Sequence, residues 1–397
     1  MSINLASIHW RSRFFLLLIP CVFGLLLVVN FRTHAETTGA VLTPPIIVGG
    51  DVLPSPKILL VSAFFPLAKS KHTLRDYEMW LSQFLKPIST DIYFYAPPEM
   101  EALVRKCRGD LPITINTTFA SPFDVAPLNG TRERYDAMHV HDRERGRHSP
   151  ELYAVWNAKP YFLDAAVKTL TQAGKDYDFA FWNDAGSFRA AHKYAGWPDP
   201  ARVREVWDEG SSLSGEKAED LVFFPLAGIP DTSFKFWTQD FGPVDNEISE
   251  GSFFGGAPRA IAWWRSTFYA YHDHYLALDI FVGKDQTLIN ALFLLFPSRF
   301  INVWLDDPAA PAHTGRSAQA QGGLGNCGPE WFYYQFWLSS RSVQDAMRTL
   351  WNKGAWLPWH WGRTRTPCRE TRVITMKDLL QWRFGNAWAP PQHTIDT

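Results

Sequence analysis

The chain has 397 residues, of which 46% are hydrophobic and 15% aromatic, and its formal net charge at pH 7 is -1. This length suffices for one large domain or two small ones. The near-neutral charge argues against a nucleic-acid partner, because domains that bind nucleic acids present a basic face. The 4 cysteines form no CxxC pair and no Cys/His spacing typical of a zinc site.

The N-terminal region predicts a membrane anchor. Residues 14–31 carry no charged side chain and are rich in Leu, Val and Phe, at the lower limit of about 17–25 residues for a spanning helix. Arg11 and Arg13 precede this run, so the positive-inside tendency keeps residues 1–13 in the cytosol, although Arg32 beyond it weakens the asymmetry. The alternative is a cleaved signal peptide. We favour the anchor, because the run is longer than a usual apolar signal region of about 7–15 residues.

The residues that follow the anchor are expected in the lumen. Residues 32–56 contain several Pro and Gly and predict a stem, and residues 57–390 predict the folded domain. Two sequons, at Asn116 and Asn129, agree with a luminal position.

Three cysteines lie outside the anchor. An odd number in an oxidising compartment suggests one disulfide and one free thiol. We expect Cys327 to pair with Cys368, which leaves Cys107 free.

The apolar pattern from residue 57 on predicts alternating strands and helices. The expected elements are a strand at 57–65, a helix capped by Thr73, strands at 91–95 and 113–118 with a helix at about 98–107 between them, a helix that starts at 149–151, and a strand at 177–181. Pro160 should bend or interrupt the last helix. Nearly continuous apolar strands between helices indicate an α/β fold, with a mainly parallel sheet covered on both faces. Residues 132–148, whose charges alternate in sign, predict a solvated loop.

Three short blocks carry the candidate site. Trp182-Asn183-Asp184-Ala185-Gly186 follows the strand at 177–181, so Asp184 falls at the carboxyl end of a strand, where ligands bind in such sheets. Gly255-Gly256 is either a strand-to-helix turn or a place where backbone amides approach a ligand. Asp285-Gln286 opens the apolar run 288–296, so Asp285 is either a helix cap or a carboxylate that handles a substrate.

These blocks resemble the HtrL/YibB-like proteins, which are glycosyltransferase-like. The resemblance extends over residues 57–305. It rests on the segments 57–65, 77–80, 153–159, 182–189, 255–256 and 285–286. The layout of residues 250–300 is also similar to that of the blood-group-type GT-A transferases.

The resemblance implies a GT-A fold that moves a sugar from a nucleotide-sugar donor to a glycan or glycoconjugate acceptor. With the anchor, this implies a single-pass type II protein of the Golgi or endoplasmic reticulum membrane. Asp285 and Gln286 are then the expected catalytic residues, and Asp184 is the expected metal ligand. The expected substrate-binding residues are Phe64, Lys159, Trp182, Arg189, Gly255 and Gly256.

The sequence departs from the usual metal motif, in which two aspartates are separated by one residue. Asp184 matches the first aspartate, and Gly186 stands at the second. A divalent metal, Mn or Mg, is therefore an open expectation, and Arg189 could do part of its work as a bidentate partner of the diphosphate. Two alternatives remain: a glycan-binding protein without turnover, and a glycoside hydrolase, which needs two carboxylates about 5–10 Å apart across a cleft.

Overall fold

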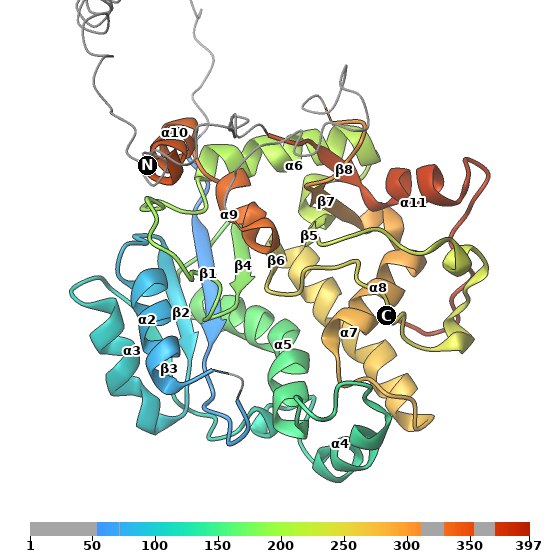
Figure 1. Cartoon of the computed structure of the whole chain (residues 1–397), viewed down its shortest axis with the longest axis horizontal. Coiled ribbons are helices and arrows are strands. Elements are labelled where there is room, and N and C mark those ends of the chain that lie inside the picture. The colour runs from blue at the N-terminus through green and yellow to red at the C-terminus, as the bar shows by residue number, and fades with distance from the viewer. Residues whose placement is uncertain (1–53, 71, 311–328, 353–369) are drawn as a thin grey trace, which may run out of the picture. The chain divides into compact units, whose positions relative to one another are not determined.

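One sheet of eight strands lies at the centre of the part of the chain that the structure describes (Figure 1). The computed structural model describes residues 54–70, 72–310, 329–352 and 370–397, and Ser55–Thr397 form one unit. The strands are β1 (Ile58–Ala63), β2 (Asp91–Tyr95), β3 (Thr114–Asn116), β4 (Phe179–Asn183), β5 (Val222–Leu226), β6 (Phe253–Gly256), β7 (Phe300–Trp304) and β8 (Val373–Thr375). Their order in the sheet is β3-β2-β1-β4-β6-β5-β7-β8.

Six of these strands run in one direction. β1 pairs in parallel with β2 and β4, β2 with β3, and β5 with β7. β6 is antiparallel to both of its neighbours, β4 and β5, and β8 is antiparallel to β7 at the edge. The prediction of a mainly parallel α/β sheet is therefore confirmed, and β6 and β8 are the reversed strands.

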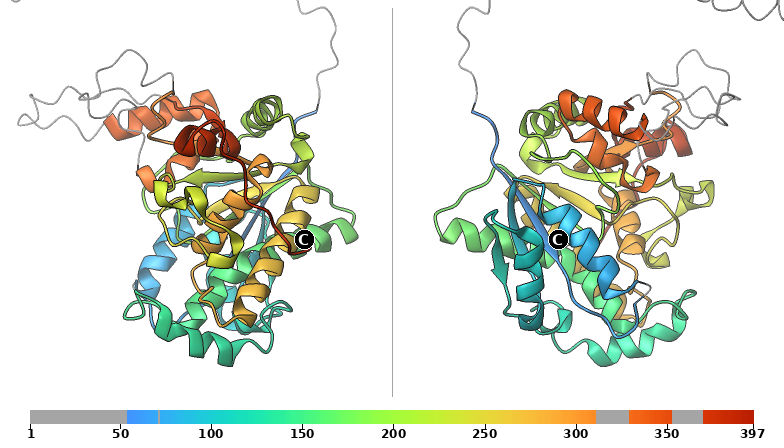
Figure 2. Two further views of the ribbon diagram at one scale, coloured as in Figure 1. Left: turned by 90° about the vertical axis from the view of Figure 1, so that its right-hand side faces the viewer. Right: turned by 60° about the vertical axis from the view of Figure 1, so that its left-hand side comes forward.

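Helices cover both faces, because alternate residues of each strand point to opposite sides. Leu59, Val61 and Phe224 belong to the core on one face, and Leu60 and Phe181 to the core on the other. The first core is closed by α5 (Pro150–Gln172), α7 (Pro258–Ala277), α8 (Asp285–Leu295) and α11 (Met376–Phe384). The second is closed by α2 (Leu74–Leu85), α3 (Glu101–Arg108), α6 (Pro200–Ser214), α9 (Tyr333–Trp337) and α10 (Arg341–Asn352). Figure 2 shows the sheet between these two layers.

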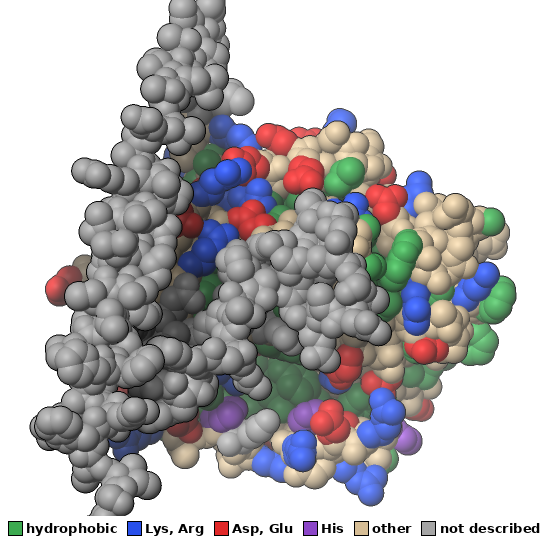
Figure 3. Space-filling model, turned by 45° about the horizontal axis from the view of Figure 1, so that its top comes forward, with side chains coloured by type: hydrophobic (Ala, Val, Ile, Leu, Met, Phe, Trp, Pro, Cys, Tyr) green, Lys and Arg blue, Asp and Glu red, His purple; other side chains and the backbone are tan. Residues whose placement is uncertain are grey.

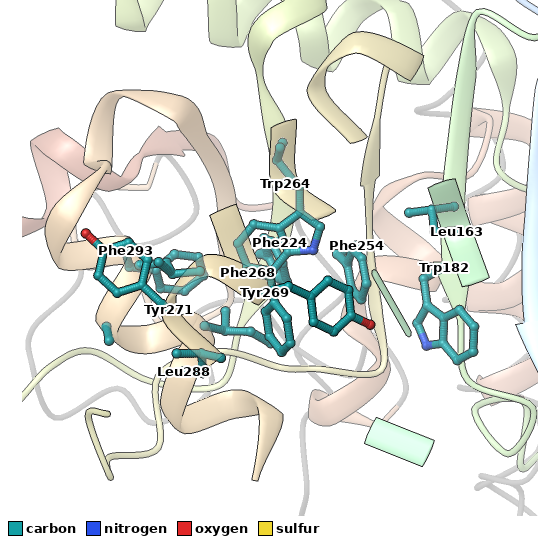
Figure 4. Packing of buried hydrophobic residues seen from close by; sticks show 14 of the residues in the cluster. Leu163, Trp182, Phe224, Phe254, Trp264, Phe268, Tyr269, Tyr271, Leu288 and Phe293 are labelled. Atoms are coloured by element: carbon teal, nitrogen blue, oxygen red, sulfur yellow. The ribbon is translucent and has the colours of Figure 1, made fainter. Parts of the chain in front are cut away.

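The core is strongly aromatic. Phe224 of β5 stacks on Phe254 of β6 at 5.1 Å between ring centroids and meets Trp264 of α7 edge-on at 5.2 Å (Figure 4). Phe293 of α8 meets the same ring at 5.3 Å. Each such pair adds about 0.5–1.5 kcal/mol beyond the free energy of burying its surface area. These aromatic contacts therefore stabilise the packing of α7 and α8 against the sheet.

The predicted helix starts are present. Thr73 accepts a hydrogen bond from the backbone of Asp76, whose carboxylate accepts one from the backbone of Thr73, so that α2 begins with a capping box. Ser149 caps α5, and Pro150 occupies its first position.

Helix α5 continues through Pro160, so of the two predicted effects, a bend or an interruption, the interruption does not occur. A proline inside a helix removes one backbone hydrogen bond and costs about 3 kcal/mol. Ala158, Phe162 and Leu163 are fully buried on either side of Pro160. Their burial at about 1.5–3 kcal/mol for each large side chain outweighs that loss.

The charged segment 132–148 is only partly a loop. Residues Arg132–Met138 form helix α4, in which Arg132 pairs with Asp136 one turn later and with Glu151 of α5. The alternating charges therefore include an i,i+4 helical pair, which the loop prediction did not consider. On the face that Figure 3 presents, basic and acidic side chains of the described residues are interspersed, in agreement with the net charge of -1.

Several predictions concern residues outside the described part of the chain: the tail at 1–13, the anchor at 14–31, most of the stem at 32–56, and the pair Cys327 and Cys368. Among the helices of the described residues, none has the length and apolar character needed to cross a bilayer. Cys107 is a buried free thiol that accepts a hydrogen bond from the Ser82 hydroxyl at 3.3 Å.

Candidate functional site

A cavity of about 430 Å³ opens at the carboxyl ends of β1 and β4. Its volume lies within the range of about 300–1,000 Å³ that is usual for ligand sites. After β1 the chain continues to β2 on one side of β1, whereas β4 pairs with the other side of β1. The cavity therefore lies at a topological switch point, which is where ligands bind in such sheets. Its wall includes residues 63–67, Tyr77 of α2, one face of α5, the loop after β4, and residues 331–332. Glu144, Arg147 and His148 from the segment before α5 also line it.

Helix α5 presents a regular face to this cavity. Leu152, Val155, Trp156 and Lys159 line it at the spacing i, i+3, i+4, i+7, which is one side of a helix over two turns. The first three supply apolar surface, and Lys159 lies nearest to the end of β4. Phe64, at the end of β1, adds an aromatic face that packs 4.8 Å from the ring of Tyr77.

The ammonium of Lys159 joins three separate segments. It lies 3.1 Å from Oδ2 of Asp285 and 3.3 Å from Oδ1 of Asp184, and it donates a 2.9 Å hydrogen bond to the carbonyl of Gly251. Burial alone would lower the pKa of Lys159, but the two carboxylates hold that pKa above its ordinary value. Lys159 is therefore a buried, charged group that holds these three segments together, and its predicted role in substrate binding stays a prediction.

Asp184 is the carboxylate that lines the cavity. Its backbone N–H donates to the carbonyl of Ser252 at 2.8 Å, and the indole of Trp182 donates to its Oδ1 at 2.6 Å. Burial raises the pKa of Asp184, although Lys159 and Trp182 act in the opposite direction. The side chain stays 33% exposed. The structure thus places Asp184 and Trp182 together at the cavity, as expected from the block 182–186.

Asp285 and Gln286 do not line the cavity. Oδ1 of Asp285 accepts a 2.9 Å hydrogen bond from the backbone N–H of Gln286 in the first turn of α8, and its Oδ2 faces Lys159. The side-chain amide of Gln286 donates to the carbonyl of Ser249 at 2.6 Å. Both of these residues therefore support the site from behind, and their predicted catalytic role stays a prediction.

Gly255 and Gly256 lie inside the sheet, where β6 pairs with β4 and β5. A Cβ atom on Gly255 would come within 2.2 Å of the carbonyl oxygen of Ala180, and one on Gly256 within 2.6 Å of that of Leu221. Glycine is needed there because neighbouring backbone approaches closely. The two glycines thus form neither the expected turn nor a part of the cavity wall.

Arg189 stands at the rim of the cavity. Its guanidinium carbon lies 4.5 Å from the ring centroid of Trp80 and 5.5 Å from that of Phe332, and its Nε donates to the carbonyl of Gly186 at 2.9 Å. Within the described residues it has no carboxylate partner. A Cβ atom on Gly186 would lie 3.3 Å from the ring of Trp80. The absence of a side chain at Gly186 therefore leaves room for this ring beneath Arg189.

Glu250 is a buried acid that sequence reasoning missed. Its side chain is 1% exposed, Oε1 accepts a hydrogen bond from the backbone of Ser252 at 3.1 Å, and Oε2 has no partner among the described residues. Burial raises the pKa of Glu250 to about 8, so most of it is neutral at pH 7. The only sequence signal was its position directly before the Gly-Ser-Phe-Phe segment.

A second missed group lies in the segment that precedes α5. The buried carboxylate of Asp142 accepts a hydrogen bond from the Tyr153 hydroxyl at 2.5 Å and contacts Nδ1 of His148 at 2.7 Å. Burial opposes ionisation, but these contacts and the backbone N–H of Glu144 lower the pKa of Asp142. Lys69 donates to the carbonyl of His148 at 2.9 Å. The segment is thereby fixed as a wall of the cavity.

A divalent cation does not fit between Asp184 and Asp285, where the ammonium of Lys159 already lies. Such ions take about six oxygen ligands, and a carboxylate must turn a free oxygen toward the ion. Oδ1 of Asp184 faces Trp182 and Lys159, Oδ2 of Asp285 faces Lys159, and Gly186 offers no side chain. Within the described residues no group of three or more His, Cys, Asp or Glu side chains is arranged to hold a metal.

Comparisons with known proteins add only distant likenesses. No protein-family model and no curated protein sequence matches the chain, so the resemblance to the HtrL/YibB-like proteins stays a prediction. Mouse xyloside xylosyltransferase 1, in its apo form, is similar over 61% of this chain and 83% of its own, with 10% identity and a TM-score of 0.34. Core-mannan synthase A from Aspergillus fumigatus, in a form with Mn and GDP, is similar over 63% and 72%, with 11% identity and a TM-score of 0.38. These values are too low to define the activity of this chain.

Proposed function

We propose that the chain is a glycosyltransferase that binds a nucleotide-sugar donor in the cavity at the ends of β1 and β4. The observation that carries the proposal is the order of charges along this cavity. Arg189 stands at the rim without a carboxylate partner among the described residues, and Asp184 lines the same cavity with part of its side chain exposed. A nucleotide sugar has the matching order, because its anionic diphosphate lies next to a ring of hydroxyl groups.

Each part of the donor finds a suitable group. The planar guanidinium of Arg189 binds phosphate oxygens bidentately, and its aromatic neighbours hold it in one plane. The carboxylate of Asp184 accepts hydrogen bonds from sugar hydroxyls. Phe64, Trp156 and Trp331 offer flat faces on which a nucleobase or a sugar ring stacks.

The transfer step uses these contacts directly. The acceptor hydroxyl oxygen forms a bond to the anomeric carbon, the bond from that carbon to the diphosphate breaks, and its electron pair leaves with the diphosphate. The proton of the acceptor hydroxyl passes to the departing diphosphate. Negative charge grows on the leaving group, and a cation already in position stabilises it without reorganising. Arg189 takes this role, Asp184 holds the sugar, and Asp285 acts through Lys159 by fixing the floor of the cavity.

The glycoside hydrolase alternative fits less well. That reaction needs two carboxylates that face each other across the scissile bond. Asp184 and Asp285 instead share one ammonium, and only Asp184 lines the cavity.

The substitution Arg189→Gln tests the proposal. Purified full-length protein is titrated with UDP-glucose, UDP-galactose, UDP-N-acetylglucosamine and GDP-mannose by calorimetry, and release of UDP or GDP is followed with and without simple sugar acceptors. We expect one donor to bind and Arg189→Gln to weaken it about 10–100-fold, because hydrogen bonds to charged groups contribute about 1.5–3 kcal/mol.

Arg105→Gln is the matched control, since Arg105 is exposed on α3 and pairs only with Glu101 in the described structure. Its donor affinity should equal that of the wild type. If no nucleotide sugar binds, or if Arg189→Gln binds as tightly as the control, the assignment is wrong. Binding without release of the nucleotide would favour the alternative of a glycan-binding protein without turnover.

We further propose that residues 14–31 anchor the protein in the Golgi or endoplasmic reticulum membrane, with the unit from Ser55 on in the lumen. Support comes from the uncharged run behind Arg11 and Arg13 and from the sequon residue Asn129, which is exposed. Asn116 is less accessible: its amide donates to the Tyr93 hydroxyl at 3.0 Å. Protease protection in sealed microsomes tests this topology.

A further inference from the structure

We propose that Lys159 is the resident cation of this site and that the protein uses no divalent metal ion between Asp184 and Asp285. The location of the cation follows from the geometry of the folded chain alone. The statement that sugar transfer proceeds without such an ion rests in addition on the proposed function.

The position of the ammonium carries the inference. Carboxylates from two distant segments converge on Nζ of Lys159, at 3.3 Å from Asp184 and 3.1 Å from Asp285, and the carbonyl of Gly251 completes the set at 2.9 Å. An ammonium has three N–H donors, and three oxygens surround it, so its donors are used within the protein. A divalent ion bound to the same two carboxylates would need oxygens at about 2.0–2.6 Å and would have to displace this ammonium.

Displacement is opposed by the packing of the lysine. Lys159 is 3% exposed, in the middle of α5, where Ala158 beside it is fully buried. Its stem is therefore packed inside the protein and not extended into solvent. An ammonium forced away from both carboxylates would remain buried without a partner, at a cost of several kcal/mol.

The buried acid beside this cluster, Glu250, does not supply a further anionic ligand. Glu250 is mostly neutral at pH 7, because burial raises its pKa to about 8. Gly186 stands where a second carboxylate of a metal motif would be. The cluster thus contains two carboxylates with one ammonium between them. Lys159 takes the place that a metal ion would have, because it joins α5, the loop after β4, the segment before β6 and the start of α8.

The substitution Lys159→Met tests this inference with Mn²⁺ as the probe. Methionine keeps the length of the stem and removes the charge, so the two carboxylates face each other without a cation. We expect Lys159→Met to melt at a lower temperature than the wild type and to regain about 4 °C in MnCl₂ at a hundred times its Kd. Wild-type protein should show no such shift.

The double variant Lys159→Met with Asp184→Asn is the matched control, because it removes the charge of one carboxylate from the new Mn²⁺ site. Its melting temperature should not respond to MnCl₂. A response of this control equal to that of Lys159→Met would place the ion elsewhere and would overturn the inference.

A second measurement does not depend on the folding of Lys159→Met. Electron paramagnetic resonance counts the Mn²⁺ ions bound by the wild type and by Asp184→Asn. Equal counts support the inference, and a wild-type ion that Asp184→Asn abolishes overturns it. Neither measurement uses a nucleotide sugar, so a failure of the proposed function and a failure of this inference are seen separately.

Discussion

Replacing Glu250 with glutamine should stabilise the protein, and the gain should grow as the pH rises. The pKa of Glu250 is about 8 in the folded state, against an ordinary value of 4.5, because the side chain is buried. The folded state keeps a proton that the unfolded state releases between these values. Stability that depends on this group is therefore fully present below pH 4.5 and is lost progressively up to about pH 8.

The size of the effect follows from the shift. One pKa unit corresponds to about 1.36 kcal/mol, so a rise from 4.5 to 8 amounts to a loss of about 4 kcal/mol between pH 5 and pH 9 in the wild type. The glutamine side chain of the variant does not titrate, and its carbonyl can still accept the hydrogen bond from the backbone of Ser252. A local opening that hydrates the carboxylate would limit the loss, so about 4 kcal/mol is an upper value.

Urea unfolding at pH 5, 7 and 9, followed by tryptophan fluorescence, measures this difference. The free energies of unfolding of wild type and Glu250→Gln should diverge steadily as the pH rises. Glu133→Gln, at an exposed position on α4, is the control and should follow the wild type. Parallel pH profiles for wild type and Glu250→Gln would refute the assignment of Glu250 as a buried neutral acid.

Two further predictions concern the sheet and the membrane. Gly255→Ala should lower the free energy of unfolding by about 1–3 kcal/mol, because its Cβ would meet the carbonyl of Ala180 at 2.2 Å. Gly146→Ala, with no atom within 4 Å of its Cβ, is the control and should melt like the wild type. Equal melting temperatures for the two variants would contradict the packing argument. In sealed microsomes, added protease should leave the unit from Ser55 on intact until detergent is added, and its digestion without detergent would contradict the luminal placement.

Local patterns were sufficient for the first half of the sheet. The predicted strand at 91–95 coincides with β2, and the strand at 57–65 contains β1, because each is a short apolar run with turn residues on both sides. β4 lies two residues later than predicted. Its expected first residues make tertiary contacts instead: Asp178 accepts a hydrogen bond from the backbone of Lys57, and the Tyr177 hydroxyl donates to Asp91.

The reversed strands could not be predicted in this way. β6 has the sequence Phe-Phe-Gly-Gly, and glycine is unfavourable in an isolated strand. It becomes a strand because Gly255 allows β4 to approach, which is a property of the pair and not of either segment. β8 has only three residues and gains its position from β7.

In the candidate site, too, local patterns predict some positions, whereas others depend on tertiary contacts that the sequence does not show. The sequence places Asp184 at the end of a strand, and the structure confirms that position beside the cavity. Asp285 was expected in the site because of the resemblance to the HtrL/YibB-like proteins, but no local pattern could show that Lys159 lies between it and Asp184. Glu250 was missed because a lone acid beside an apolar strand gives no sign of its burial.

Residues near the end of the chain complete both the site and the sheet. Phe332 is the second ring that packs against Arg189, and β8 (Val373–Thr375) is the edge strand beside β7. Tyr334 of α9 stacks on Phe253 of β6, with 4.6 Å between the ring centroids. Residues from the last sixth of the chain therefore cover this part of the sheet. During synthesis, the half of the sheet formed by β1 to β4 leaves the ribosome long before these residues do. The nascent protein therefore carries an uncovered aromatic surface until α9 has been synthesised. Such surfaces bind chaperones or aggregate, so productive folding of this protein depends on protection until its C-terminal segment arrives.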